Sequence, residues 1–197
     1  MAGRRPGAPD TRGEIVAAAR AELAQRGYDG TSIRAVARRA SVDPALVHHY
    51  FKDKQRLVNA ALALPADPVA VMEPVLAAPS DQAGEAFVRA LVTTWDDPAN
   101  RESVIATTRS GLGNAEQGSM ITEFILRGPI AAVVDRHRPD APAAVSAMLL
   151  AQMTGLVVTR YLLAVEPLAS MSVDEVVALV GPEVQDVLDL DATRAPA

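Results

Sequence analysis

Side chains able to bind a polyanion are concentrated between residues 31 and 54. They carry guanidinium, imidazole, phenol and ammonium groups, and they are Arg34, Arg38, His48, His49, Tyr50 and Lys54. Each group donates hydrogen bonds that phosphate oxygens or base edges accept. Residues 1–60 hold 11 Lys and Arg against 6 Asp and Glu, whereas residues 61–197 hold 8 against 18. The front of the chain is therefore expected to meet a nucleic acid, with a solvated basic surface as the alternative.

Two short helices joined by a tight turn are needed to position these groups. Apolar residues between Ile33 and Ala40 recur at the i, i+3, i+4 and i+7 positions of a helix. After a three-residue turn, Asp43 can cap the next helix and Pro44 can take its first position, where the missing N–H costs nothing. This pattern is typical of a helix-turn-helix, whose second helix lies in the major groove of DNA.

A further helix on each side braces this pair. The preceding helix begins at Asp10 or Thr11 and ends in a left-handed cap at Gly27. Asp53 can cap the following helix. The predicted domains are a disordered basic arm at 1–9, a helix-turn-helix DNA-binding domain at 10–64 and a helical domain at 65–197.

Helical patterns fill the rest of the chain, separated by prolines and glycines. The expected spans are 68–78, 81–96, 100–113, 118–137, 141–165 and 172–189. Pro129 and Pro182 fall inside two of these spans and should kink or break them. The predicted fold class is all-α, with an N-terminal three-helix helix-turn-helix domain and a C-terminal helical domain.

Several functional classes find no support in the sequence. The chain has no cysteine, which excludes disulfides, thiol catalysis and thiolate-bound zinc. It has no glycine-rich phosphate loop, metal-binding His and Glu pair or nucleophile elbow, so no cofactor is expected and an all-helical enzyme is only an alternative. His48 and His49 are adjacent, but neighbouring helical residues point about 100° apart and no third metal ligand is suitably spaced. We expect no membrane-spanning run and no signal peptide, which favours the cytoplasm.

Residues Gly27 to Leu57, GYDGTSIRAVARRASVDPALVHHYFKDKQRL, resemble the signature of the TetR family of bacterial transcriptional regulators. The matching elements are Gly27-Tyr28, Thr31-Ser32-Ile33, Val36-Ala37, Ala40-Ser41-Val42, Leu46 to Phe51, Lys54 and Leu57. The resemblance is specific over about residues 11–62. Over the rest of the chain it rests only on the length of the chain and its all-helical character. Pro44 departs from it, because many relatives carry a polar residue there that can donate to a base or a phosphate. Base recognition is therefore expected to shift toward His48, His49 and Leu46.

The resemblance implies that the helix-turn-helix contacts DNA, and each contact has a physical reason. Thr31 and Lys54, near helix starts, are expected at phosphates, and Leu46 at a thymine methyl. Arg34 as a plain surface charge and Tyr50 as a core aromatic are the alternatives to contact. The predicted DNA-binding residues are Thr31, Arg34, Pro44, Ala45, Leu46, His48, His49, Tyr50 and Lys54.

A helix-turn-helix this small needs a second copy, because two-fold related copies fix the spacing of two half-sites. The last two helices are the expected dimer interface, since one carries small residues at i, i+4 and i+8 and the other a valine face. The predicted interface residues are Ala147, Ala151, Gly155, Val177, Val180 and Val184. The resemblance implies a four-helix bundle between two copies, and the alternative is that both helices belong to the core of one chain.

Regulators that resemble this chain hold a small-molecule effector in the C-terminal domain. The candidate ligand-binding residues are Met72, Phe87, Leu91, Trp95, Arg109, Phe124, Met148 and Gln152, together with Met153. Methionine and aromatic side chains suit an adaptable apolar pocket and equally suit an ordinary core. Arg109 and Gln152 are polar groups in apolar helices, so a ligand carboxylate or hydroxyl, helix carbonyls or water must pair them if they are buried.

The function implied by the resemblance is that of a cytoplasmic repressor. A homodimer binds a palindromic operator in double-stranded DNA, and a small apolar effector releases it by tilting the fourth helix. A DNA-binding regulator without an effector and an activator are the alternatives.

Overall fold

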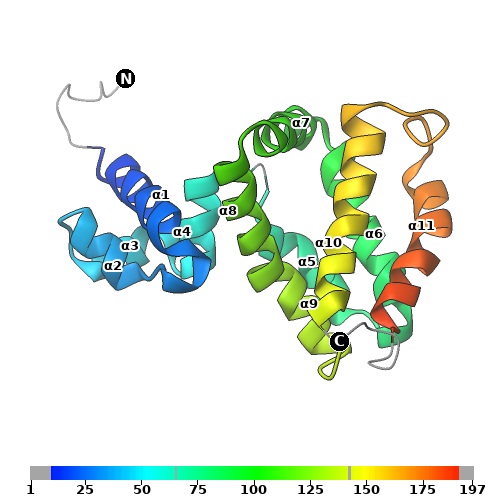
Figure 1. Ribbon diagram of the computed structural model, residues 1–197, viewed down its shortest axis with the longest axis horizontal. Coiled ribbons are helices and arrows are strands. Elements are labelled where there is room, and N and C mark those ends of the chain that lie inside the picture. Colours follow the sequence, from blue (N-terminus) through cyan, green and yellow to red (C-terminus); the bar gives the residue numbers. More distant parts are fainter. Residues whose placement is uncertain (1–9, 65, 142, 191–197) are drawn as a thin grey trace, which may run out of the picture. The chain divides into compact units, whose positions relative to one another are not determined.

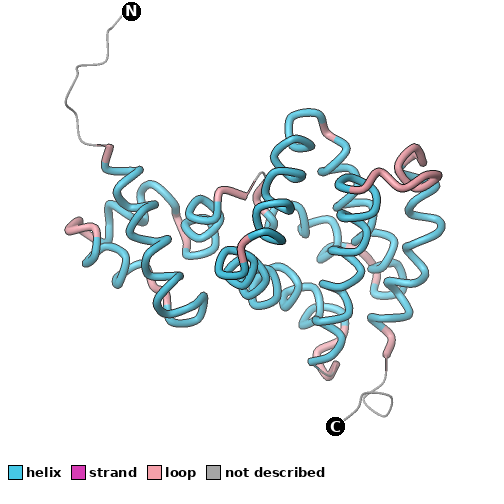
Figure 2. The backbone as a smooth tube through the Cα atoms, turned by 45° about the horizontal axis from the view of Figure 1, so that its top comes forward, coloured by secondary structure: helices cyan, strands magenta, loops and turns pink. Residues whose placement is uncertain are grey.

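A computed structural model describes residues 10–64, 66–141 and 143–190 of the chain (Figure 1). These residues form helices joined by loops, and no strand occurs among them (Figure 2). The all-α prediction is therefore confirmed. The chain divides into two compact units, Met1–Leu62 and Ala63–Ala197, close to the predicted domain boundary. The predicted basic arm at 1–9 lies outside the described residues.

Four helices follow one another in the described part of the first unit. They are α1 (Thr11–Gly30), α2 (Ile33–Arg39), α3 (Pro44–Phe51) and α4 (Lys54–Leu62). α1 contacts α2 and α4, and α3 contacts α2 and α4, so the four helices share one small core. Its fully buried residues include Ile15, Val36, Val47 and Leu57.

Side-chain caps set the starts of these helices. Asp10 accepts the N–H of Gly13 at the start of α1, and Asp43 accepts the N–H of Ala45 at the start of α3. The carboxylate of Asp53 accepts the N–H of Arg56 at 2.8 Å in the first turn of α4. Gly27 has a φ of 66° and interrupts the regular helix near the end of α1, in the left-handed region that glycine tolerates best.

The second unit is an array of longer helices. It begins with α5 (Pro68–Ala77), the 3-10 turn η1 (Ser80–Gln82) and α6 (Ala83–Asp96). α7 (Pro98–Gly113) and α8 (Ala115–Ile125) follow, and α8 continues through the π-helical turn η2 (Leu126–Ile130) into α9 (Ala131–His137). α10 (Ala143–Val157) continues into the π-helical turn η3 (Val158–Leu162), and α11 (Val173–Leu188) is the last helix described.

The two helix-internal prolines behave differently. Pro129 lies in η2, where the backbone widens to a π-helical turn and the chain continues into α9. Pro182 lies inside α11, which runs through it without a break. The expected distortion is therefore present at Pro129, whereas Pro182 does not break its helix.

α6 and α11 pack with their backbones in contact in the core of the second unit. An ideal Cβ built on Gly84 would lie 2.5 Å from both the Gln185 nitrogen and the Gly181 carbonyl oxygen. The side chain of Gln185 accepts the N–H of Gly84 at 2.9 Å and donates to the carbonyl of Ser80 at 3.0 Å. Because Gln82 supplies no side-chain cap to α6, α11 satisfies this end of the helix instead.

The expectation that the chain has no membrane-spanning run is wrong by the criteria of length and composition for one helix. Residues Ala143–Leu162 are long and apolar enough, by length and composition alone, to cross a membrane. The core helix of a soluble protein passes the same test, so this is weak evidence for a membrane span. Only 28% of the apolar window is buried inside the chain, so this helix leaves an apolar surface uncovered.

Candidate nucleic-acid interface and apolar cavity

Helix α3 is buried on one side and exposed on the other. Val47 and Phe51 lie four residues apart and are buried. The exposed side chains of the helix include Pro44, Ala45, His48 and His49. Leu46 is half-buried, and Tyr50 is 42% exposed with its ring edge-on to the His49 ring at 5.6 Å between centroids. α3 therefore presents small, apolar and imidazole side chains to the surface of the first unit.

The two predicted contacts at the start of α2 differ in their outcome. Arg34 is exposed and makes no ion pair with a residue that the structure describes. Thr31 is 1% exposed, and its hydroxyl donates to the carbonyl of Gly27 at 2.7 Å. The predicted contact of the Thr31 side chain with DNA is therefore corrected, because this side chain lies inside the fold. Ser32 caps α2 by accepting the N–H of Ala35 at 3.2 Å.

Lys54 is held against an aromatic ring of α1. Its Nζ lies 4.1 Å from the centroid of Tyr28, and the side chain is half-buried. Burial raises the pKa of the Tyr28 phenol, so the ring stays neutral beneath the ammonium. A cation over an aromatic face contributes about 0.5–1 kcal/mol at exposed sites. The contact fixes a positive charge at the first residue of α4.

A buried carboxylate fixes α2 against α1. Glu22 is buried, and its Oε1 accepts a hydrogen bond from Arg39 Nε at 2.7 Å. Its Oε2 lies 3.2 Å from Arg26 Nε. The hydrogen bond from Arg39 and the neighbouring arginine charges hold the pKa of Glu22 below its usual 4.5. On the other side of α1, Arg20 Nε donates to the carbonyl of Ala61 in α4 at 3.0 Å.

The second unit contains a cavity of about 240 Å³. Helices α5, α6, α7, α8 and α10 line it with η2 and with Leu64 and Ala66. The lining is apolar except for the Trp95 indole and five hydroxyls, those of Thr94, Thr107, Thr108, Thr122 and Thr154. Among the lining residues that the structure describes, none carries a charge. The cavity is therefore suited to an apolar molecule.

The structure brings together half of the side chains proposed for a ligand. Those that line the cavity are Met72, Phe87, Leu91 and Trp95, together with Met153. The other four lie outside it. Arg109 is exposed, Met148 is 44% exposed, Gln152 is half-buried and Phe124 is fully buried. These four side chains are therefore not among those that line this cavity.

Sequence reasoning missed the threonines of the cavity. Thr107 and Thr108 lie on α7, Thr122 on α8 and Thr154 on α10. A threonine inside an otherwise apolar helical stretch could have indicated a hydroxyl in the pocket. Thr154, between Met153 and Gly155, is the clearest example.

The predicted dimer residues fall into two groups. Ala147, Ala151 and Gly155 are exposed along α10. On α11, Val177 is 3% and Val184 1% exposed, and both belong to the core cluster that includes α6 residues, while Val180 is half-buried. The prediction for Val177 and Val184 is therefore corrected, because their own chain covers them. The large exposed hydrophobic residue of α11 is Leu179.

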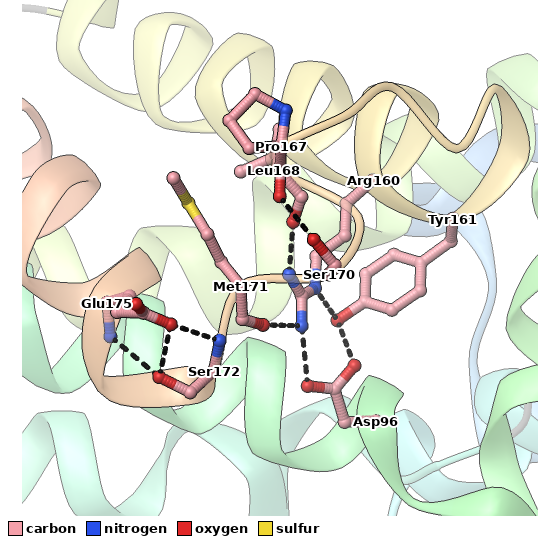
Figure 3. A network of polar contacts seen from close by, with 9 residues as sticks. All are labelled: Asp96, Arg160, Tyr161, Pro167, Leu168, Ser170, Met171, Ser172 and Glu175. Carbon is pink, nitrogen blue, oxygen red and sulfur yellow. Dashed lines mark hydrogen bonds and ion pairs between the residues drawn. The ribbon is translucent and has the colours of Figure 1, made fainter.

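A buried arginine network supports one wall of the cavity (Figure 3). Arg160 is 4% exposed, and it donates to Asp96 Oδ2 at 2.9 Å, to the Met171 carbonyl at 2.8 Å and to the Leu168 carbonyl. Tyr161 donates its hydroxyl to Asp96 Oδ1 at 3.0 Å, and burial raises its pKa. The Tyr161 ring packs edge-on against Trp95 at 5.8 Å between centroids. The network thus ties η3 and the loop before α11 to the end of α6 beside the cavity.

Comparison with known families gives two matches. The family described as bacterial regulatory proteins, tetR family, matches residues 15–61. The family described as tetracyclin repressor-like, C-terminal domain, matches residues 81–188, which is more than half of the chain. A comparison with curated proteins gave no match.

The chain is similar to several solved structures. The multidrug binding protein EbrR complexed with imidazole has a TM-score of 0.51 at 21% identity, covering 94% of this chain and 93% of EbrR. The fatty acid degradation regulator FadR from Bacillus halodurans has a TM-score of 0.50 at 15% identity, covering 91% and 100%. A TetR-family regulator from Streptomyces coelicolor A3 is 29% identical with a TM-score of 0.43, covering 95% and 99%.

Proposed function

Because the chain belongs to the TetR family of bacterial transcriptional regulators, we propose that it is a repressor that binds a palindromic operator as a homodimer and is released by a small-molecule effector. The observation that carries this proposal is the exposed face of α3. A helix anchored by Val47 and Phe51, with His48 and His49 outward, has the form of a recognition helix that enters a major groove.

Different residues of this surface have different proposed roles. His48 and His49 donate to base edges or phosphates, and Leu46 contacts a thymine methyl. Pro44 and Ala45 carry no donor, so they permit close approach without specifying a base. Tyr50 donates its hydroxyl to a phosphate. Arg34 and Lys54 neutralise the phosphate backbone and position the helix.

The proposed dimer forms through the uncovered apolar surface of the second unit. Ala147, Ala151 and Gly155 are exposed at four-residue spacing on α10, so another helix can approach closely along this row. Met148 on α10 is 44% exposed and Leu179 on α11 is 59% exposed, so a partner that covers them would bury further apolar area. A second copy with the same surface would cover both the small-residue row and these two large side chains. Two-fold symmetry would then present two copies of α3 to two half-sites.

The proposed effector binds in the cavity of the second unit. α4 ends at Leu62, and the cavity lining begins with Leu64 only two residues later in the chain. A ligand that displaces this segment acts directly on the end of α4, which α1 holds through the bond from Arg20 to Ala61. Release requires that the effector bind the operator-free conformation more tightly than the operator-bound one. Such a regulator acts on the chromosome, so the proposal implies a cytoplasmic protein.

The experiment that tests this proposal begins with selection of bound sequences from a random pool of duplex DNA. The operator affinity is then measured by fluorescence anisotropy over a series of salt concentrations. Lys54→Ala should reduce the slope of log affinity against log salt by about one unit, because one phosphate contact is lost. Arg136→Ala removes an exposed charge from the second unit and should leave the slope unchanged. Failure to select any sequence, or an equal slope in Lys54→Ala and the unmodified protein, would contradict the proposal.

A further inference from the structure

The cavity of the second unit offers hydrogen bonds but no charge. Thr94 uses its hydroxyl proton within its own helix, donating to the Ala90 carbonyl at 2.7 Å. The other four hydroxyls make no hydrogen bond with a residue that the structure describes, and they belong to Thr107, Thr108, Thr122 and Thr154. Thr107, Thr108 and Thr154 are half-buried and Thr122 is exposed, and each hydroxyl can serve a molecule in the cavity both as a donor and as an acceptor.

Three of these hydroxyls lie near the crossing of α7 and α8. An ideal Cβ on Gly118 would lie 2.4 Å from the Gly111 carbonyl oxygen, so the two backbones touch at this crossing. Thr108 and Thr122 lie one turn from it, on α7 and α8 respectively, and Thr107 adjoins Thr108. The glycine pair thus brings two hydroxyl-bearing helix turns to the same part of the cavity wall.

A charged molecule would find no compensation in this cavity. An ion that leaves water needs a counter-ion or several hydrogen bonds to replace its hydration. No described lining residue supplies a counter-ion. Arg109, the guanidinium nearest in sequence to Thr108, is exposed and outside the lining. Phe87 and Trp95 belong to the lining, but the attraction of a cation to an aromatic ring is weaker than the hydration that a buried ammonium loses.

We propose that this cavity selects uncharged, largely apolar molecules that carry one or two hydrogen-bonding oxygen atoms, and rejects carboxylates and ammonium ions of the same skeleton. This inference rests on the proposed function, in which the cavity is the effector site. A cavity of about 150 Å³ holds benzene. By the same scale, the volume of about 240 Å³ holds roughly ten non-hydrogen atoms.

The single tryptophan of the chain makes this inference directly measurable. Trp95 lines the cavity, so its fluorescence reports occupancy of this site. The full-length protein is titrated at neutral pH with 1-octanol, octanoate and octylammonium, which share an eight-carbon chain and differ in the charge of the head group. The Kd of 1-octanol should be lower than that of either ion by about tenfold or more. An ion that binds as tightly as 1-octanol, or a fluorescence that none of the three changes, would overturn the inference.

Removing hydroxyls without changing shape tests the proposed recognition. The double variant Thr108→Val/Thr122→Val should raise the Kd of 1-octanol by roughly fivefold or more, since each lost hydrogen bond weakens binding. The same variant should bind butylbenzene, which has ten non-hydrogen atoms and no oxygen, as tightly as the unmodified protein does. Thr93→Val is the matched control, because Thr93 is exposed on α6 beside Thr94 and lies outside the lining. An unchanged affinity of the double variant for 1-octanol would overturn the assignment of these hydroxyls.

A parallel measurement of operator affinity separates this inference from the proposed function. If 1-octanol occupies the cavity selectively and operator affinity does not change, the proposed release fails and the chemistry of the cavity stands. If a charged probe binds best and releases the operator, effector control stands and the inference fails.

Discussion

Replacing Gly84 with alanine tests the backbone contact between α6 and α11. The new Cβ would lie 2.5 Å from the Gln185 nitrogen and from the Gly181 oxygen, whereas ordinary contact begins at 3.4 Å. The two helices must therefore separate by roughly 1 Å, and overpacking of this kind costs about 1–3 kcal/mol. Separation also weakens the hydrogen bonds of Gln185 to Gly84 and Ser80, each worth about 1 kcal/mol. Alanine recovers at most about 1 kcal/mol through its higher helix propensity.

We therefore expect Gly84→Ala to lower the free energy of unfolding by about 2 kcal/mol. Urea unfolding at fixed protomer concentration measures this change, because dimerisation would make the midpoint depend on concentration. Gly113→Ala is the control, since no atom lies within 4 Å of its ideal Cβ, and this substitution at the end of α7 should not lower the stability. A Gly84→Ala protein as stable as the unmodified one would refute the close packing of these helices.

Three further predictions concern single side chains. The folded pKa of Glu22 lies below 4.5, so its stabilisation is present above about pH 4.5 and is lost as the pH falls through the folded pKa. Glu22→Gln should therefore flatten the acid side of a plot of urea midpoint against pH, and an unchanged acid side would argue against the pairing with Arg39. Ala151→Glu should sediment as a monomer in analytical ultracentrifugation while Ala106→Glu, on the exposed surface of α7, stays a dimer; a dimeric Ala151→Glu would exclude α10 from the interface. Arg160→Lys keeps the charge but loses the planar set of donors, so urea unfolding should show a loss of about 3 kcal/mol, and full stability would contradict the role given to this network.

The helix-turn-helix could be predicted from the sequence because local signals set its boundaries. Asp43 and Pro44 specify a helix start by a carboxylate cap and a missing N–H, and the structure has both at the start of α3. Gly27 marks the end of the regular part of α1 by its positive φ. Thr31 and Ser32 carry equivalent hydroxyls, so sequence could not decide which one caps α2 and which one is buried.

The cavity and the outer surface of the second unit could not be predicted in the same way. The valines of α11 mark one apolar face, but periodicity does not say whether α6 or a second copy covers it. α6 covers Val177 and Val184 because Gly84 and Gly181 let the two backbones meet. Thr107, Thr108 and Thr122 line the cavity near the crossing of α7 and α8 at Gly111 and Gly118, a contact that depends on tertiary packing.

The central claim is that the exposed face of α3 reads DNA. The most direct test is the operator affinity of His48→Ala and His49→Ala, measured by fluorescence anisotropy at fixed salt against both the selected operator and random duplex DNA. Both variants should keep the unfolding midpoint of the unmodified protein, since both side chains are exposed. We expect each to weaken operator binding by about tenfold and to weaken binding to random DNA much less, because a lost base contact costs about 1–3 kcal/mol. Undiminished preference for the operator in both variants would contradict the claim.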